Sequence, residues 1–302
     1  MSEEKQREWR QQIIDYYADN VGEELFCIPR ASSGAYLSSV LIEGRMKAGI
    51  PILRWEMPAE FSGRPEAERY SETQAWCEDN IAPALAALDP ARASFFGEDF
   101  GRSGDLTVIC PLQIAPDLTR RTPFVVELRN IPFRNQEQVL FYVADHLPRF
   151  TTGAMDARGN GQYLAETAAQ RYGGRIVQVM LSEAWYRENM PRYKAAFEDG
   201  TIEIPKDADV LADHRAIVLE QGVAKISERR AGSDGKGRHG DSAMAAALAF
   251  FASRADAGQI AYTPARASGK RESVAGPGAS FGAPRWKRIW LAGARADSSN
   301  DE

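Results

Sequence analysis

The sequence has few of the features that mark a disulfide scaffold, a zinc site or a membrane protein. Its 302 residues include three cysteines, Cys27, Cys77 and Cys110, which are far apart and form no CxxC pair. Isolated thiols are typical of a reducing compartment. No apolar run is long enough to span a membrane, and the charged start MSEEKQREWRQ shows no signal peptide. We therefore expect a soluble intracellular protein.

Nucleotide-binding loops are also missing. No stretch matches G-x-x-x-x-G-K-[ST], and the nearest approach, 232–237, is followed by Arg238 and His239. The glycines at 159 and 161 resemble the start of a dinucleotide-binding turn, but Leu164 stands at the third glycine position. The sequence therefore predicts no ATPase motor, and a dinucleotide site is a weak alternative. The net charge of −5 excludes a protein that is basic all over, but it allows a basic patch beside acidic ligands.

From Ser94 onward the pattern is that of strands alternating with helices, and 44% of the residues are hydrophobic, enough for a substantial core. This order predicts an α/β fold with a central mixed sheet flanked by helices. A mainly helical segment precedes it, and a tail rich in Gly, Ala, Pro, Ser and Arg, expected to be disordered, follows it. The predicted strands are 94–99, 106–112, 124–128, 152–155 and 175–181, with a last edge strand at 223–226, and the main helices are 1–22, 41–48, 67–88, 136–146, 162–172 and 241–254.

Three aspartates occupy one kind of position, at the end of a predicted element. Asp99 ends the first strand, Asp156 ends the fourth strand, and Asp241 begins the last, apolar helix. If the two strands are neighbours, the carboxylates emerge side by side, and a helix packed on the sheet can add the third. Such a cluster must be neutralised by protons or cations, and oxygen ligands favour Mg²⁺ or Mn²⁺. Two ions about 3.5–4 Å apart can activate water and stabilise the leaving oxygen of a phosphodiester.

Each aspartate also has a purely structural interpretation. Asp241 is a good N-cap residue, and Asp156 can close a turn. Asp105 is either an auxiliary ligand or a turn residue, and His239 either contacts phosphate or is a plain loop residue. The basic residues that could contact DNA are Arg102 and Arg158 beside the acids, Arg229, Arg230, Lys236 and Arg238 in a glycine-rich loop, and a basic tail, 266–295, with Trp286 and Trp290.

The strings GEDFGRSGDLTVI, LRNIPFRNQ, LPRFTTGAMDARGNGQYLAE and RHGDSAMAAALAFFAS resemble the C-terminal nuclease domain of phage large terminase subunits, of the type found in Mu-like phages and prophages. The resemblance covers roughly residues 90–255. It implies an RNase H-like fold and metal-dependent cutting of double-stranded DNA during packaging, with Asp99, Asp156 and Asp241 as the catalytic and metal-binding triad. It also implies two Mg²⁺ or Mn²⁺ ions, other terminase subunits and the portal protein as partners, no membrane, and the cytoplasm of the bacterial host.

The resemblance also implies a division of the chain. Residues 1–90 look similar to the end of a terminase ATPase domain plus linker, 91–255 to the nuclease domain, and 256–302 form a flexible basic tail. Two alternatives remain open at this stage. One is another RNase H-like nuclease, such as a resolvase or transposase-like enzyme, and the other is a non-enzymatic prophage remnant that acts as an interaction module.

Overall fold

The computed structural model describes residues 3–17, 25–26, 35–101, 106–159, 161–226 and 238–255. Within these residues the main sheet has nine strands. They are β1 (Met46–Lys47), β2 (Ile52–Glu56), β3 (Ser94–Asp99), β4 (Leu106–Ile114), β5 (Arg120–Arg121), β6 (Val125–Arg129), β7 (Phe150–Asp156), β8 (Ile176–Val179) and β9 (Ile202–Pro205).

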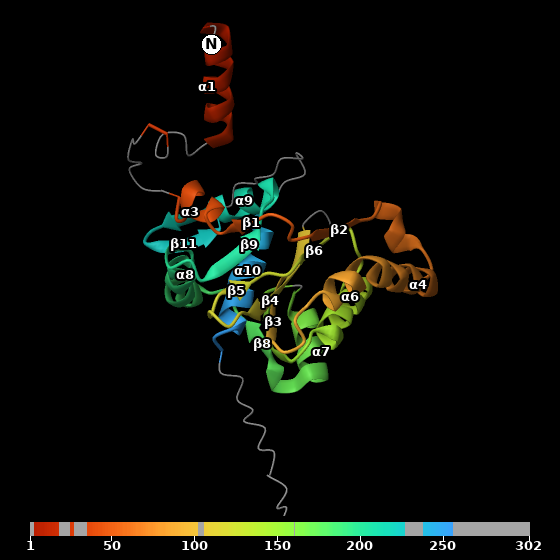
Figure 1. Cartoon of the computed structure of the whole chain (residues 1–302). Helices are drawn as coiled ribbons and strands as arrows, with labels where there is room; N and C mark the ends of the chain where they lie inside the picture. Colours follow the sequence, from red (N-terminus) through yellow and green to blue (C-terminus); the bar gives the residue numbers. More distant parts are fainter. Residues whose placement is uncertain are drawn as a thin grey trace, which may run out of the picture. The chain divides into compact units, whose positions relative to one another are not determined.

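The centre of the sheet has the order β6-β4-β3-β7-β8. Figure 1 labels β6, β4, β3 and β8 of this group, together with the helices packed around them. β4 is antiparallel to both β3 and β6, whereas β7 is parallel to β3 and to β8. Three antiparallel strands, β3, β4 and β6, are followed in the chain by β7 and β8, which add parallel to β3 after the helices α6 and α7. This is the strand order of an RNase H-like fold. The α/β fold with a central mixed sheet that the sequence predicts is therefore confirmed.

The sheet forks along the outer side of β4. Its first half pairs with β6, which continues to β2, and its last residues pair with β5, which continues to β9 and β1. β1 and β2 precede residue 91, so the sheet begins earlier in the chain than the predicted nuclease domain. The helix predicted at 41–48 is shorter in the structure, which has a helix at Ser39–Glu43 followed by β1.

Helices cover both faces of the sheet. One core lies between the sheet and α8, α9 and α10, and the other lies between the sheet and α4, α5, α6 and α7. The α-helices are α1 (Glu3–Tyr17), α3 (Ser39–Glu43), α4 (Glu66–Trp76), α5 (Ala82–Ala86), α6 (Phe133–His146), α7 (Gly161–Tyr172), α8 (Glu183–Glu198), α9 (Ala208–Arg215) and α10 (Asp241–Ala252), and a π-helical turn, Cys77–Ile81, joins α4 to α5.

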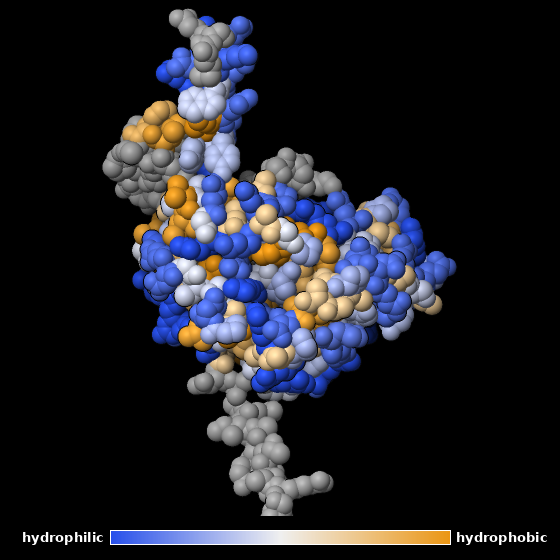
Figure 2. Space-filling model, viewed as in Figure 1, coloured by the Kyte–Doolittle hydropathy of each residue, from blue (hydrophilic) through white to orange (hydrophobic). Residues whose placement is uncertain are grey.

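The predicted edge strand at 223–226 does form, but outside the main sheet. It is β11 (Val223–Ile226), and it pairs with β10 (Ile217–Glu220) in a separate two-stranded sheet. On the face shown in Figure 2, polar residues are spread over the surface and apolar ones form small groups. No helix in the described ranges has the length and apolar character needed to cross a membrane. The predicted tail, 256–302, lies outside these ranges.

α10 packs directly on the backbone of β3. A Cβ atom added to Gly97 would lie 2.0 Å from the carbonyl oxygen of Ala245 and 2.2 Å from the backbone nitrogen of Ala249. Such an approach requires glycine in the strand and small residues in the helix, whose sequence is DSAMAAALAFFA. The helix that the sequence predicts to be buried is buried along almost its whole length. Its position on β3 determines where its first residue, Asp241, lies.

Candidate active site

β3 and β7 end side by side, and each ends in an aspartate. Glu98 pairs with Met155, so the next residues in each strand, Asp99 and Asp156, are neighbours at the same edge. Side chains alternate along a strand, so Asp99 lies on the same face as Gly97, which is the face that α10 covers. The parallel pairing of two strands thus brings together two of the three predicted residues, although 57 positions separate them.

α10 brings in the third aspartate. Gly97 lies against α10 at Ala245 and Ala249. Four residues of helix cover about 6 Å and two residues of strand about 6.6 Å, so Asp241, four residues before Ala245, can reach the end of β3. The electrostatics agree, because burial first, and then the charges of Asp241 and Asp156, raise the pKa of Asp99 well above its usual range. The structure therefore gathers all three aspartates at one end of the sheet.

The site is crowded with negative charge in a partly dry setting. Asp156 and Asp241 are each only 7% exposed to solvent. Burial, followed by the charge of Asp213, raises the pKa of Asp241 to about 7. A carboxylate with such a pKa lacks the solvation it has in water, and a nearby cation would restore its charge.

Arg158 binds the second aspartate. Its Nε lies 3.1 Å from Oδ1 and 3.3 Å from Oδ2 of Asp156, and its Nη2 lies 3.1 Å from Oδ2. The backbone N–H of Arg158 also donates to Oδ1, so Asp156 closes the turn that follows β7 as well. The sequence places Arg158 beside this acid as a DNA contact, and in the structure its guanidinium faces the acid itself.

The prediction that Arg238 contacts DNA is wrong, because this residue is buried, with 3% of its surface exposed. Its Nη2 lies 2.8 Å from Oε1 of Glu127 and 2.7 Å from Oδ2 of Asp213. The hydroxyl and backbone N–H of Ser242 donate to the same Asp213 oxygen. These bonds anchor the chain on both sides of Asp241. Two buried carboxylates require a counter-charge, and Arg238 supplies it.

Asp241 is the first residue of α10 and not its N-cap, which is Gly240 with φ of 79°. The side chain of Asp241 accepts a hydrogen bond from the backbone N–H of His239 at 3.2 Å. The turn before α10 therefore contacts this carboxylate through its backbone. The other loop candidates, Arg229, Arg230 and Lys236, lie outside the described residues, as do Arg102 and Asp105.

Sequence reasoning missed two residues beside the site. Tyr186 of α8 lies close to Arg158, Asp99 and Asp156, and burial raises its pKa. Glu98 is completely buried, and within the described part of the chain neither of its carboxylate oxygens has a hydrogen-bond partner. Burial, and then the charge of Asp156, raise the pKa of Glu98 well above its usual range. Its position directly before Asp99 was the available signal.

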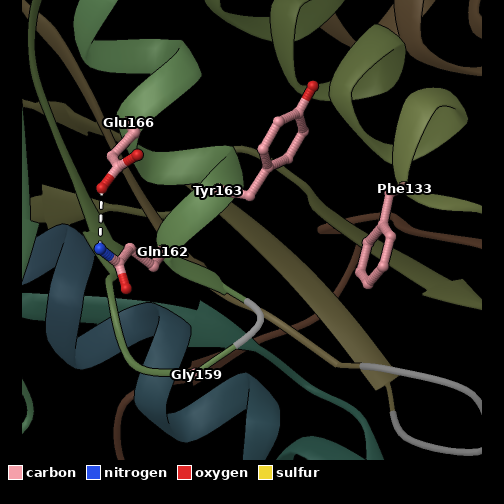
Figure 3. Close-up of a pocket in the computed structure, with 5 residues that line it drawn as sticks. All are labelled: Phe133, Gly159, Gln162, Tyr163 and Glu166. Carbon is pink, nitrogen blue, oxygen red and sulfur yellow. Dashed lines mark hydrogen bonds between the residues drawn. The ribbon is translucent and has the colours of Figure 1, made fainter.

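A pocket of about 310 Å³ lies between the beginnings of α6 and α7 (Figure 3). Two of the segments that surround it contact residues next to the aspartates. Phe133 stacks on Phe100, which follows Asp99, with ring centroids 5.2 Å apart. Gly161 begins α7 so close to Asp156 that an added Cβ would lie 2.5 Å from the Asp156 carbonyl oxygen. The lining residues are Phe133, Gly159, Gln162, Tyr163 and Glu166.

The aspartates fit a divalent cation in the kind of atoms they offer. All three supply carboxylate oxygens, which are ligands that Mg²⁺ and Mn²⁺ prefer. Among the described side chains, no three His, Cys, Asp or Glu residues are already arranged to enclose an ion. The orientation of Asp156 explains part of this result, because both of its oxygens face Arg158.

Two curated proteins match most of the chain. It is 41% identical over 264 residues to Mu-like prophage FluMu protein gp28 of Haemophilus influenzae, covering 86% of this chain and 52% of that protein. It is 43% identical over 259 residues to the probable terminase, large subunit gp28 of Escherichia phage Mu, covering 83% and 47%. The chain is a homologue of the gp28 proteins of Mu-like phages. It spans about half the length of these relatives, and no family model matches it.

Several solved structures of phage large terminases are similar to this gp28 homologue. The nuclease of phage G20c with bound magnesium is 20% identical, with a TM-score of 0.45 over 54% of this chain and 83% of that chain. The large terminase of bacteriophage HK97 is 12% identical, with a TM-score of 0.46 over 84% and 51%. The nuclease domain of Thermus phage P74-26 is 17% identical, with a TM-score of 0.42 over 54% and 80%.

Proposed function

We propose that the chain is a divalent-metal-dependent endonuclease that cuts double-stranded DNA during phage packaging. The observation that carries this proposal is the gathering of Asp99, Asp156 and Asp241 at one end of an RNase H-like sheet. The 43% identity to a probable terminase large subunit supports the packaging role. Asp99, Asp156 and Asp241 are the proposed catalytic and metal-binding residues.

Each aspartate has a distinct place in the proposed site. Asp99 is on the central strand β3, and the charges of Asp156 and Asp241 both act on it, so its carboxylate would help to hold the metal. Asp156 and Asp241 approach it from β7 and from α10, and their burial keeps competing water away. The two bound Mg²⁺ or Mn²⁺ ions would activate a water molecule and stabilise the leaving oxygen of the phosphodiester. A sheet and a helix that are packed backbone to backbone hold these side chains on rigid supports.

The proposal places the chain with other terminase subunits and the portal protein, in the cytoplasm of a bacterial host. Residues 1–90 include β1 and β2, so we propose that the nuclease unit comprises strands from both sides of residue 91. The cleavage chemistry requires no ATP, and this chain carries no phosphate-binding loop of the ATPase type.

The test is cleavage of plasmid DNA with Mg²⁺ or Mn²⁺ and with EDTA. We expect cleavage by the natural chain in the presence of metal, and a loss of about 100-fold or more in Asp99→Asn, because a direct ligand contributes at least as much as the outer partners of metal sites. Asp79→Asn, an exposed aspartate of the π-helical turn, is the matched control and should cut normally. Full activity of Asp99→Asn would refute the site, and a natural chain that cuts no DNA would favour an interaction module.

A further inference from the structure

The guanidinium of Arg158 binds the two oxygens of Asp156 that a metal ion would also use. Nε and Nη2 contact both carboxylate oxygens, at 3.1 to 3.3 Å, so the interaction is bidentate. Planar guanidinium–carboxylate pairs of this kind are among the stronger charge-assisted interactions in proteins. They also occupy the oxygen lone pairs that a metal ion would need.

Arg158 acts on more than its direct partner. Its positive charge opposes the rise in the pKa of Asp99 that burial and the neighbouring acids cause. Arg158 therefore supplies part of the positive charge that the cluster of acids requires. A divalent ion entering between Asp99 and Asp156 would supply the same charge and would compete for the same oxygens.

The Arg158 head group makes two further contacts while it binds Asp156. Nη1 donates to the carbonyl oxygen of Leu181 at 3.4 Å, and the hydroxyl of Tyr186 lies close enough to interact with it. The Arg158 side chain is 48% exposed, so it faces the solvent from which DNA would arrive. A guanidinium freed from a carboxylate matches the geometry of a phosphate equally well.

We propose that Arg158 is an internal counter-ion that occupies the cation position at Asp156, gives way when metal binds, and then holds a phosphate of the DNA. This proposal rests on the proposed nuclease function. It assigns Arg158 two successive partners, a carboxylate before metal binding and a phosphate after it.

The test is the affinity for Mn²⁺ alone, measured by titration calorimetry on the full chain without DNA. Because the competing charge is removed, Arg158→Gln should bind Mn²⁺ about five- to tenfold more tightly than the natural chain. At saturating Mn²⁺, the same variant should cut DNA about tenfold or more slowly, because the phosphate contact is lost. The matched control is Arg171→Gln, in the last turn of α7, which removes a similar guanidinium from Asp145 of α6 and should change neither value.

Two further results make the proposal falsifiable. Arg158→Lys keeps the charge without the bidentate fork, so its Mn²⁺ affinity should lie between those of the natural chain and Arg158→Gln, and this variant also serves if Arg158→Gln does not fold. Unchanged or weaker Mn²⁺ binding in a folded Arg158 variant would overturn the inference, as would unchanged cleavage at saturating metal. The nuclease proposal would survive either result as long as Asp99→Asn abolishes cleavage.

Discussion

Asp99, Asp156 and Asp241 bring three carboxylates together, and among the described residues two guanidinium groups, Arg158 and Arg238, moderate their charge. The two cations differ in setting. Arg158 is half exposed and can exchange partners, whereas Arg238 is buried among Glu127 and Asp213. The two arginines therefore have different surroundings, one at the proposed active site and the other among buried carboxylates beside it.

Replacement of Arg238 tests that support. In Arg238→Leu, Asp213 loses its buried partner and Glu127 loses one of two, since Arg54 still binds it at 2.8 Å. Removing one member of a buried ion pair typically costs about 3–5 kcal/mol, so we expect a loss of about 3 kcal/mol in urea unfolding.

The control for this variant is Arg187→Ala, which removes an exposed pair with Glu183 and should cost less than about 1 kcal/mol. A loss in Arg238→Leu as small as that of the control would show that the buried pairs do not hold the start of α10.

At the residue scale, the sequence predicts the three acids as site residues because each ends or begins a strongly apolar element, and this assignment stays a prediction. It did not identify the role of Arg238, because its partners lie 25 and 111 positions away in the chain. The same limit applies to Tyr186, which reaches the acids from a helix whose sequence shows no sign of them. The spacing of residues along the chain does not show which distant residues the fold brings into contact.

Among the elements, α10 and β3 matter most, because their contact at Gly97 determines the position of Asp241. The sequence predicts a buried helix from its apolar composition, and the structure confirms it. Composition does not show which strand the helix meets or at which residue. The pairing of short strands such as β1 and β2 is equally hard to predict, since their partners β9 and β6 lie far along the chain.

Gly97→Ala tests this contact. The added methyl group would overlap the backbone of Ala245 and Ala249, which has no flexible end that could move aside. Overpacking commonly costs about 1–3 kcal/mol, and contact with backbone puts this variant at or above the upper value. We expect a lower melting temperature together with a loss of DNA cleavage, because Asp241 moves with the helix.

Gly174→Ala is the matched control for this prediction, because an added Cβ there meets nothing within 4 Å. It should melt and cut DNA like the natural chain. If Gly97→Ala were as stable and active as Gly174→Ala, α10 would not be held where the site requires it.

At the scale of the whole molecule, the forked sheet and both helical layers lie between residues 35 and 255. All three aspartates belong to this part, and the nuclease proposal needs no residue outside it. The chain spans about half the length of its gp28 relatives. The general fold class followed from the alternation of strands and helices, whereas the fork and the separate β10–β11 sheet depend on long-range pairing.

The most direct test of the central claim is anomalous diffraction from crystals of the chain grown with Mn²⁺, collected with and without a short DNA duplex. We predict anomalous peaks between the carboxylates of Asp99, Asp156 and Asp241, with the Arg158 guanidinium moved away from Asp156. Manganese bound elsewhere, or aspartate side chains too far apart to share an ion in the presence of both metal and DNA, would contradict the account.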